Sequence, residues 1–239
     1  MHYIPILSTL VTFGFTVSVL SRYSRKGGTH LLLWGVGLIL FGLGTLTEVI
    51  LSFTFSGLAL RLWYLCGAML TAAWLGQGTV NLLIRKRGVA TTLNYILLVV
   101  SLGALALLLT SPLTSAASSY NVNSPISTQY KDILTRSGLT IFLTIILNIY
   151  GTICLVGGAL YSAYLFWRKK VLLNRVIGNI LIAAGALMPA MAGSLVQAGL
   201  VDALYISELL GVIVMFVGFW QATSPQVALN SETAAAPSR

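Results

Sequence analysis

Seven long apolar stretches run through this chain of 239 residues, and short polar segments separate them. A helix needs roughly 20 mostly apolar residues to cross the hydrocarbon core of a bilayer. The sequence therefore predicts seven transmembrane helices, at about residues 3–20, 30–52, 58–84, 92–110, 138–167, 176–199 and 205–223. The predicted fold class is all-α: a polytopic membrane protein with a seven-helix bundle in residues 1–223 and a disordered cytoplasmic tail at 224–239.

Charged residues make up only 8% of the chain, whereas about 25% is usual in a soluble protein. This composition excludes a soluble globular domain. The net charge is +9, but the basic residues lie in short runs between apolar stretches, so nucleic acid is not an expected partner. We expect a multi-pass protein of the plasma (inner) membrane, whose helices are surrounded by the lipid bilayer.

The basic residues also predict an orientation, because cytoplasmic loops carry an excess of Lys and Arg. One side of the predicted bundle has only Arg61, Lys131 and Arg136. The other side has Arg22, Arg25, Lys26, Arg85, Lys86, Arg87, Arg168, Lys169, Lys170, Arg175 and Arg239. The asymmetry predicts that the N-terminus lies outside and the C-terminus lies in the cytoplasm.

A weak internal similarity suggests a repeat. When the first three predicted helices are placed on the last three, Gly67 matches Gly211 and Gln77 matches Gln221. Parallel repeats of this kind occur in some transporters. The sequence therefore allows a 3+1+3 arrangement of the seven helices.

Three ionisable residues, Glu48, Arg61 and Glu208, fall inside predicted helices, each within about one turn of the outer end. An ionisable side chain costs roughly 2.5–3.5 kcal/mol at the bilayer centre, so it marks a functional or structural site. Helical spacing places Glu48 and Glu208 on faces with small residues such as Gly44 and Gly211, which pack against other helices. Two interpretations stay open: an outward-facing polar pocket that binds a solute or relays a proton, or a structural ion pair that pins the helices.

Further polar residues extend this candidate binding set. Asn148 falls near the middle of the fifth helix, where an interhelical hydrogen bond is the main alternative to a binding role. Gln197 and Gln77 lie toward the ends of the sixth and third helices. Pro189 interrupts the sixth helix and frees a backbone carbonyl, which predicts either a gating hinge or a static bend.

Two features at the predicted outer surface have structural alternatives. The segment of residues 111–137 is the longest connection and is rich in Ser, Thr, Asn and Pro, so it is either a lid over an outer cavity or an inert connector. Tyr3, Trp63, Tyr64 and Tyr205 fall at the outer membrane level. Aromatic residues there usually anchor the helices at the interface.

No cofactor and no metal site are expected. Cys66 and Cys154 lie inside apolar stretches, and His2 and His30 lie at segment ends, which argues against haem and metal ligation. Microbial rhodopsins share the plan of seven helices with the N-terminus outside, and they hold retinal on a lysine of the seventh helix. All five lysines of this chain fall in predicted loops, which excludes a retinal Schiff base.

The preferred functional hypothesis is a small transporter or channel with an outward-facing polar pocket for an unidentified small solute or ion. The alternatives are a seven-helix receptor or sensor that signals to a separate cytoplasmic partner, or a structural subunit of a membrane complex. An enzyme is not expected, and no catalytic residue is assigned, although a membrane-embedded lipid-modifying enzyme stays open. Assembly into a homo-oligomer also stays open.

Overall fold

The computed structural model describes residues 3–84, 86, 88–169, 173–197 and 203–224, and it leaves out the side chains of residues 192–197. The α-helices are α1 (Tyr3–Lys26), α2 (Thr29–Leu51), α3 (Gly57–Leu62), α4 (Thr71–Leu83), α5 (Val89–Thr110), α6 (Ile126–Ile133), α7 (Gly138–Thr152), α8 (Gly158–Arg168), α9 (Leu173–Gln197) and α10 (Ala203–Thr223). Within these ranges no strand is present, so the all-α prediction is confirmed.

Seven helical spans are long and apolar enough to cross a membrane, as the sequence predicts. The third span consists of α3, the π-helical segment η1 (Trp63–Leu70) and α4, and the fifth consists of α7, the π-helical segment η3 (Ile153–Gly157) and α8. The first span continues beyond its apolar part and ends at Lys26, with Arg25 and Lys26 in its last turn. Cations are favourable at a helix C-terminus, so this helix is longer than its apolar stretch.

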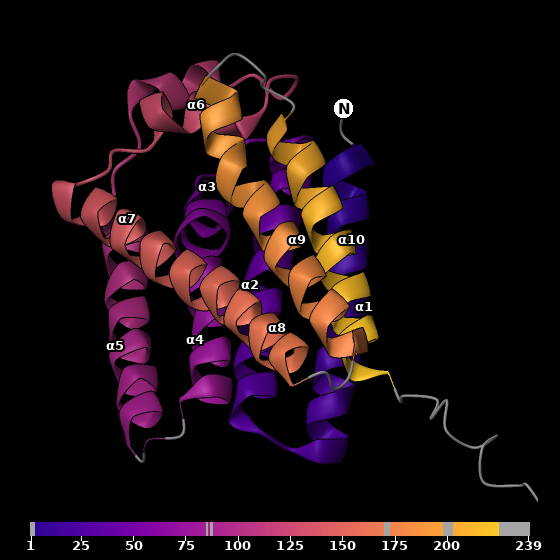
Figure 1. Cartoon of the computed structure of the whole chain (residues 1–239). Helices are drawn as coiled ribbons and strands as arrows, with labels where there is room; N and C mark the ends of the chain where they lie inside the picture. Colours follow the sequence, from indigo (N-terminus) through magenta and orange to yellow (C-terminus); the bar gives the residue numbers. More distant parts are fainter. Residues whose placement is uncertain (1–2, 85, 87, 170–172, 198–202, 225–239) are drawn as a thin grey trace, which may run out of the picture.

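Figure 1 shows how the spans are arranged. Helices α9, α10 and α1 stand side by side, and α5 lies at the opposite edge of the bundle (Figure 1). The span formed by α7 and α8 is strongly tilted and packs against α4. Helix α6 lies above the end of the bundle at which α1 begins.

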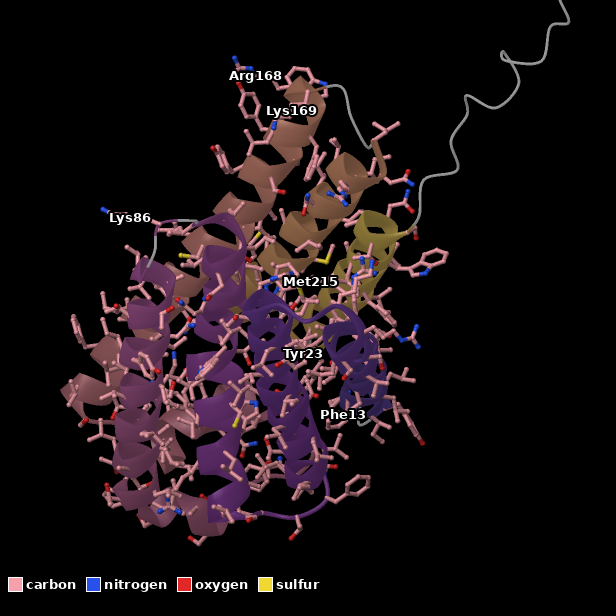
Figure 2. All side chains as sticks on the ribbon, turned by 90° about the horizontal axis from the view of Figure 1, so that it is seen from below. Phe13, Tyr23, Lys86, Arg168, Lys169 and Met215 are labelled. Carbon is pink, nitrogen blue, oxygen red and sulfur yellow. The ribbon has the colours of Figure 1, made fainter. Side chains whose placement is uncertain are left out.

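The described basic residues form two groups, one at each end of the bundle. Lys86 lies between α4 and α5, and Arg168 and Lys169 lie at the end of α8, and in Figure 1 these helix ends are opposite α6. Figure 2, seen from below, labels the three residues. Arg61 on α3, Lys131 on α6 and Arg136 lie toward the α6 end. This arrangement agrees with the asymmetry seen in the sequence, and the orientation relative to the cytoplasm stays a prediction. Residues 225–239 of the predicted tail lie outside the described residues.

Glycines allow the closest helix crossings. A Cβ atom added to Gly151 of α7 would lie 2.2 Å from the backbone carbon of Ala72 in α4, and one added to Gly185 of α9 would lie 2.6 Å from the carbonyl oxygen of Gly211 in α10. Small residues at such crossings bring helix backbones into direct contact and increase van der Waals packing in a membrane. The spans around the middle of the bundle are therefore held at short separations.

A buried apolar layer fills the half of the bundle away from α6. Its members come from α1, α2, α4, η3 and α10 and include Phe15, Val19, Leu31, Leu38, Phe41, Leu75, Leu155, Val212, Met215 and Phe219. Phe15 of α1 stacks on Phe216 of α10, with ring centroids 4.9 Å apart. This apolar layer packs α1, α2, α4, η3 and α10 against one another in that half of the bundle.

Candidate functional site

A cavity of about 690 Å³ occupies the half of the bundle nearer to α6. Its walls come from α2, η1, α4, α7, η3, α9 and α10, and residues of α6 border its upper end. Four of the candidates from the sequence line it: Glu48, Asn148, Pro189 and Glu208. The volume lies within the range of roughly 300–1,000 Å³ that is usual for sites that bind small molecules.

The two glutamates meet inside this cavity. Glu48 of α2 is only 2% exposed, and Glu208 of α10 is half-buried, with its Oε2 atom inaccessible. Their carboxyl groups lie close enough to interact electrostatically, and neither Oε2 atom has an N–H or O–H donor among the described groups. Two carboxyl groups that share one site favour a state in which one of them is protonated. We call this pair of carboxyl groups the dyad.

Glu48 has one further polar partner, the indole of Trp63. The Trp63 Nε1–H donates to Glu48 Oε1 at a distance of 2.7 Å. Trp63 belongs to η1 and is 6% exposed. The prediction of an interfacial belt is therefore wrong for Trp63, and also for the buried Tyr64 and Tyr205, whereas Tyr3 is exposed. Burial beside the acids takes these three aromatic side chains away from the interface.

Arg61 does not join the acid pair. Its Nε and Nη2 atoms donate to the carbonyl oxygen of Ser111 at 3.2 and 2.8 Å, and Nη1 donates to the carbonyl of Gly57 at 3.3 Å. Arg61 also does not line the cavity. Arg61 therefore links α3 to the end of α5, and the described contacts include no ion pair between Arg61 and Glu48. A binding role for Arg61 stays a prediction.

The Asn148 side chain lies at the cavity wall and makes two backbone contacts. Its Nδ2 atom donates to the carbonyl of Ala68 in η1 at 2.7 Å and to the carbonyl of Thr144 in its own helix at 2.8 Å. A π-helical segment disturbs the regular pairing of backbone groups, and such segments are frequent at functional sites. Asn148 therefore provides the predicted interhelical hydrogen bond at a point where the wall is built from irregular helix.

Gln77 belongs to a separate polar cluster, away from the cavity. It is fully buried, its Nε2 atom donates to the carbonyl of Ala90 at 3.2 Å and to Asn94 Oδ1, and its Oε1 atom accepts from the Tyr150 hydroxyl. Asn81 Nδ2 also donates to Asn94 Oδ1, at 2.7 Å. These contacts join α4, α5 and α7, and Gln77 is not among the residues that line the cavity.

Two candidates on α9 have different outcomes. The side chain of Gln197 lies outside the described residues. Pro189 lies inside α9 and borders the cavity, and its ring faces the backbone of Gly211, where an added Cβ would lie 3.0 Å from Pro189 Cδ. Proline leaves the carbonyl of residue 185 without its usual donor. The role as a hinge stays a prediction.

The segment of residues 111–137 folds into a cap on the bundle, and its role as a lid stays a prediction. It contains the 3₁₀-helical segment η2 (Ser115–Ser119) and α6, and backbone hydrogen bonds from Thr114 to Ile133 and from Thr135 to Pro112 close its base. Ile133 is buried in the same core cluster as residues of η1 and α5. The segment therefore packs on the bundle as a folded unit.

Contacts from this cap reach the elements that carry the acids. The Tyr120 hydroxyl donates to the carbonyl of Leu51 in α2 at 2.9 Å, and the Tyr205 side chain of α10 lies beside the backbone of Ile126. Burial and the nearby carboxyl of Glu48 raise the pKa of the Tyr120 phenol, which keeps it protonated as a donor. The cap is thus joined to both helices of the dyad.

Three residues of α6 border the cavity, and the sequence does not single them out. They are Ser127, whose buried Oγ atom has no partner among the described groups, Tyr130 and the exposed Lys131. Tyr130 packs edge-on against Trp63, with ring centroids 5.2 Å apart, and the Arg136 guanidinium lies 5.0 Å from the Tyr130 ring centroid. An amphipathic pattern over 126–133 was the one signal that α6 covers a packed surface.

Comparison of the chain with protein-family models, with curated proteins and with solved structures finds no match. Within the described ranges, no group of three or more His, Cys, Asp or Glu side chains is placed to hold a metal ion. The cavity and its acid pair are therefore the features that indicate a function for this chain.

We predict that Trp63→Phe destabilises the protein by roughly 1–3 kcal/mol, because it leaves a buried carboxyl oxygen without its donor. Trp74 is the matched control, since its Nε1–H donates to the neutral hydroxyl of Ser101 at 3.1 Å. Trp74→Phe should cost only about 1 kcal/mol, the usual value for a neutral hydrogen bond. Thermal unfolding of both purified variants measures the difference, and equal losses would contradict the importance of the Trp63–Glu48 contact.

Proposed function

We propose that this integral membrane protein is a small transporter that binds a solute in the cavity and uses Glu48 and Glu208 to carry a proton. The observation that supports it most is the meeting of two carboxyl groups inside a solute-sized cavity. Ionisable groups are costly inside a membrane and usually mark a substrate pathway or a proton relay. A purely structural pair needs no adjoining cavity.

The apolar layer below the cavity favours a transporter over a channel. Leu75, Leu155 and Met215 belong to this layer and also border the cavity. A channel needs a continuous polar or wide path, whereas a transporter opens its site to one side of the membrane at a time. A solute in this cavity is separated from the far side by packed side chains, as alternating access requires.

Reconstitution of the full chain into liposomes tests this proposal. Currents on a solid-supported membrane are recorded after rapid addition of glucose, glutamate, choline or dodecylamine, which represent neutral, anionic, cationic and amphiphilic cationic solutes. At least one of them should evoke a transient current that depends on the proton gradient and is absent from protein-free liposomes. Silence with all four solutes, or a sustained current under voltage without any solute gradient, would overturn the proposal.

A further inference from the structure

The cavity is polar at one end and apolar at the other. Glu48 lies within one turn of the end of α2 at Leu51, beneath α6, and Glu208 lies near the start of α10. Met215, at the deep end, lies two turns further along α10, which is about 10 Å at roughly 1.5 Å per residue. A ligand that fills this space needs a polar group at one end and an apolar body.

The cavity also reaches the surface that faces the lipid. Ile149 of α7 and Ile153 of η3 are 51% and 66% exposed, and both border the cavity. On the other side of this opening stands Ala190 of α9, which is exposed and borders the cavity as well. In Figure 1 the upper part of α7 diverges from α9. Because these residues belong to spans, the opening faces lipid chains and not water.

The acids indicate the charge of the polar group. Glu48 Oε2 and Glu208 Oε2 are buried, border or adjoin the cavity and have no donor among the described groups. An ammonium group supplies several N–H donors and a positive charge, and charge-assisted hydrogen bonds of this kind are the strong ones. The described cations at this end of the bundle are engaged or peripheral: Arg61 binds the Ser111 carbonyl, Arg136 lies over the Tyr130 ring, and Lys131 is exposed on α6.

We propose that the cavity binds a single-chain amphiphilic amine that enters from the membrane between α7–η3 and α9. Its ammonium group binds Glu48 and Glu208, and its hydrocarbon chain extends toward Met215 and Leu155. The inference deepens the proposed function, since it names the ligand class of the same site. A single chain suits the cavity volume, which is typical of sites for drug-sized molecules.

When the amine binds, one proton of the dyad is exchanged for the positive charge of the ammonium group. Without ligand the dyad holds one proton and one negative charge. When the ammonium binds, the proton leaves the dyad, both carboxyl groups become carboxylates, and the ligand adds one positive charge. The net charge of the site is therefore unchanged. The other titratable side chains around the dyad are the phenols of Tyr120, Tyr130 and Tyr205 and the side chain of Lys131 on α6.

The ligand class is tested by binding of tritiated dodecylamine to the full chain in phosphatidylcholine nanodiscs, with empty nanodiscs as the blank. Dodecylamine should bind at least about tenfold more tightly than dodecanol, which lacks the charge, and than butylamine, which lacks the chain. Binding should release close to one proton at pH 7, measured with a pH-indicator dye. Equal affinity for dodecanol, or no proton release, would overturn the assignment.

Variants locate the site and its entrance. The Glu48→Gln/Glu208→Gln variant should lose binding, whereas Asp132→Asn, on an exposed position of α6, should keep it. Ile153→Trp should slow association at least about fivefold without a change in Kd, because it obstructs the entrance only. Ile145→Trp is the matched control, since Ile145 is 52% exposed on α7 but does not border the cavity. Equal association rates in both tryptophan variants would overturn the lateral route.

Two outcomes separate this inference from the proposed function. Dodecylamine binding without solute-driven current would leave the ligand class standing and overturn transport. Proton-dependent current with glucose or glutamate, without dodecylamine binding, would leave transport standing and overturn the ligand class. Competition by phosphatidylethanolamine in the nanodisc would overturn the single-chain assignment, since that lipid presents an amine on two chains.

Discussion

Replacing both Glu48 and Glu208 by glutamine should abolish solute-driven proton movement while the protein stays folded. The dyad is then unable to hold or release a proton, and an amide provides no negative charge for a cationic solute. Loss of a charge-assisted contact of about 1.5–3 kcal/mol corresponds to roughly 10- to 100-fold weaker binding. Proton flux into proteoliposomes that contain a pH-sensitive dye measures the effect.

The fold should tolerate this double variant, for a reason visible in the contacts. The side-chain carbonyl of a glutamine at position 48 can still accept the hydrogen bond from Trp63 Nε1. The other amide can donate across the pair, which satisfies the contact between α2 and α10 without a shared proton. Asp132→Asn removes one charge outside the cavity and should leave the proton flux unchanged. Proton flux at the original rate in the double variant would contradict the role of the dyad.

Gly151→Val should unfold or strongly destabilise the protein, by at least about 3 kcal/mol. The added Cβ would lie 2.2 Å from the backbone carbon of Ala72 and 2.3 Å from its carbonyl oxygen, and backbone atoms are unable to move aside as a flexible side chain does. Helices α4 and α7 would have to separate, which also opens the cavity wall at Asn148 and Ala68.

The control for this prediction is Gly103→Val on α5. Nothing lies within 4 Å of a Cβ atom added at Gly103, and this residue is exposed to lipid in the same kind of span. Thermal unfolding of both variants in detergent, followed by tryptophan fluorescence, separates a local packing effect from a general effect of valine. Similar unfolding temperatures for the two variants would show that α4 and α7 are not held by this crossing.

The seven spans were predictable because apolar length alone defines a membrane helix. The inward direction of Glu48 and Glu208 was also predictable, because residues three and four positions away, such as Gly44 and Gly211, are small and pack against other helices. These inferences need only local periodicity. They are the part of the candidate site that does not depend on the tertiary arrangement.

The partners of these residues were not predictable from the sequence. Arg61 binds the carbonyl of Ser111, which lies 50 positions away, and a backbone carbonyl has no sequence signature. The sequence predicts an interfacial anchor at Trp63, whereas in the structure Trp63 belongs to η1 and donates a hydrogen bond to Glu48. The meeting of Glu48 with Glu208 depends on the packing of α2 and α10 around the cavity, which neither helix specifies alone.

The number of residues in the π-helical segment η1, between Trp63 and Thr71, sets how the upper part of this span is rotated relative to the lower part. Each residue of an α-helix turns the chain by roughly 100°. Loss of a single residue from this segment would therefore rotate Trp63 away from Glu48 relative to the lower part of the same span, even if every remaining side chain were kept. This stretch of the chain should tolerate substitution far better than it tolerates a change of length.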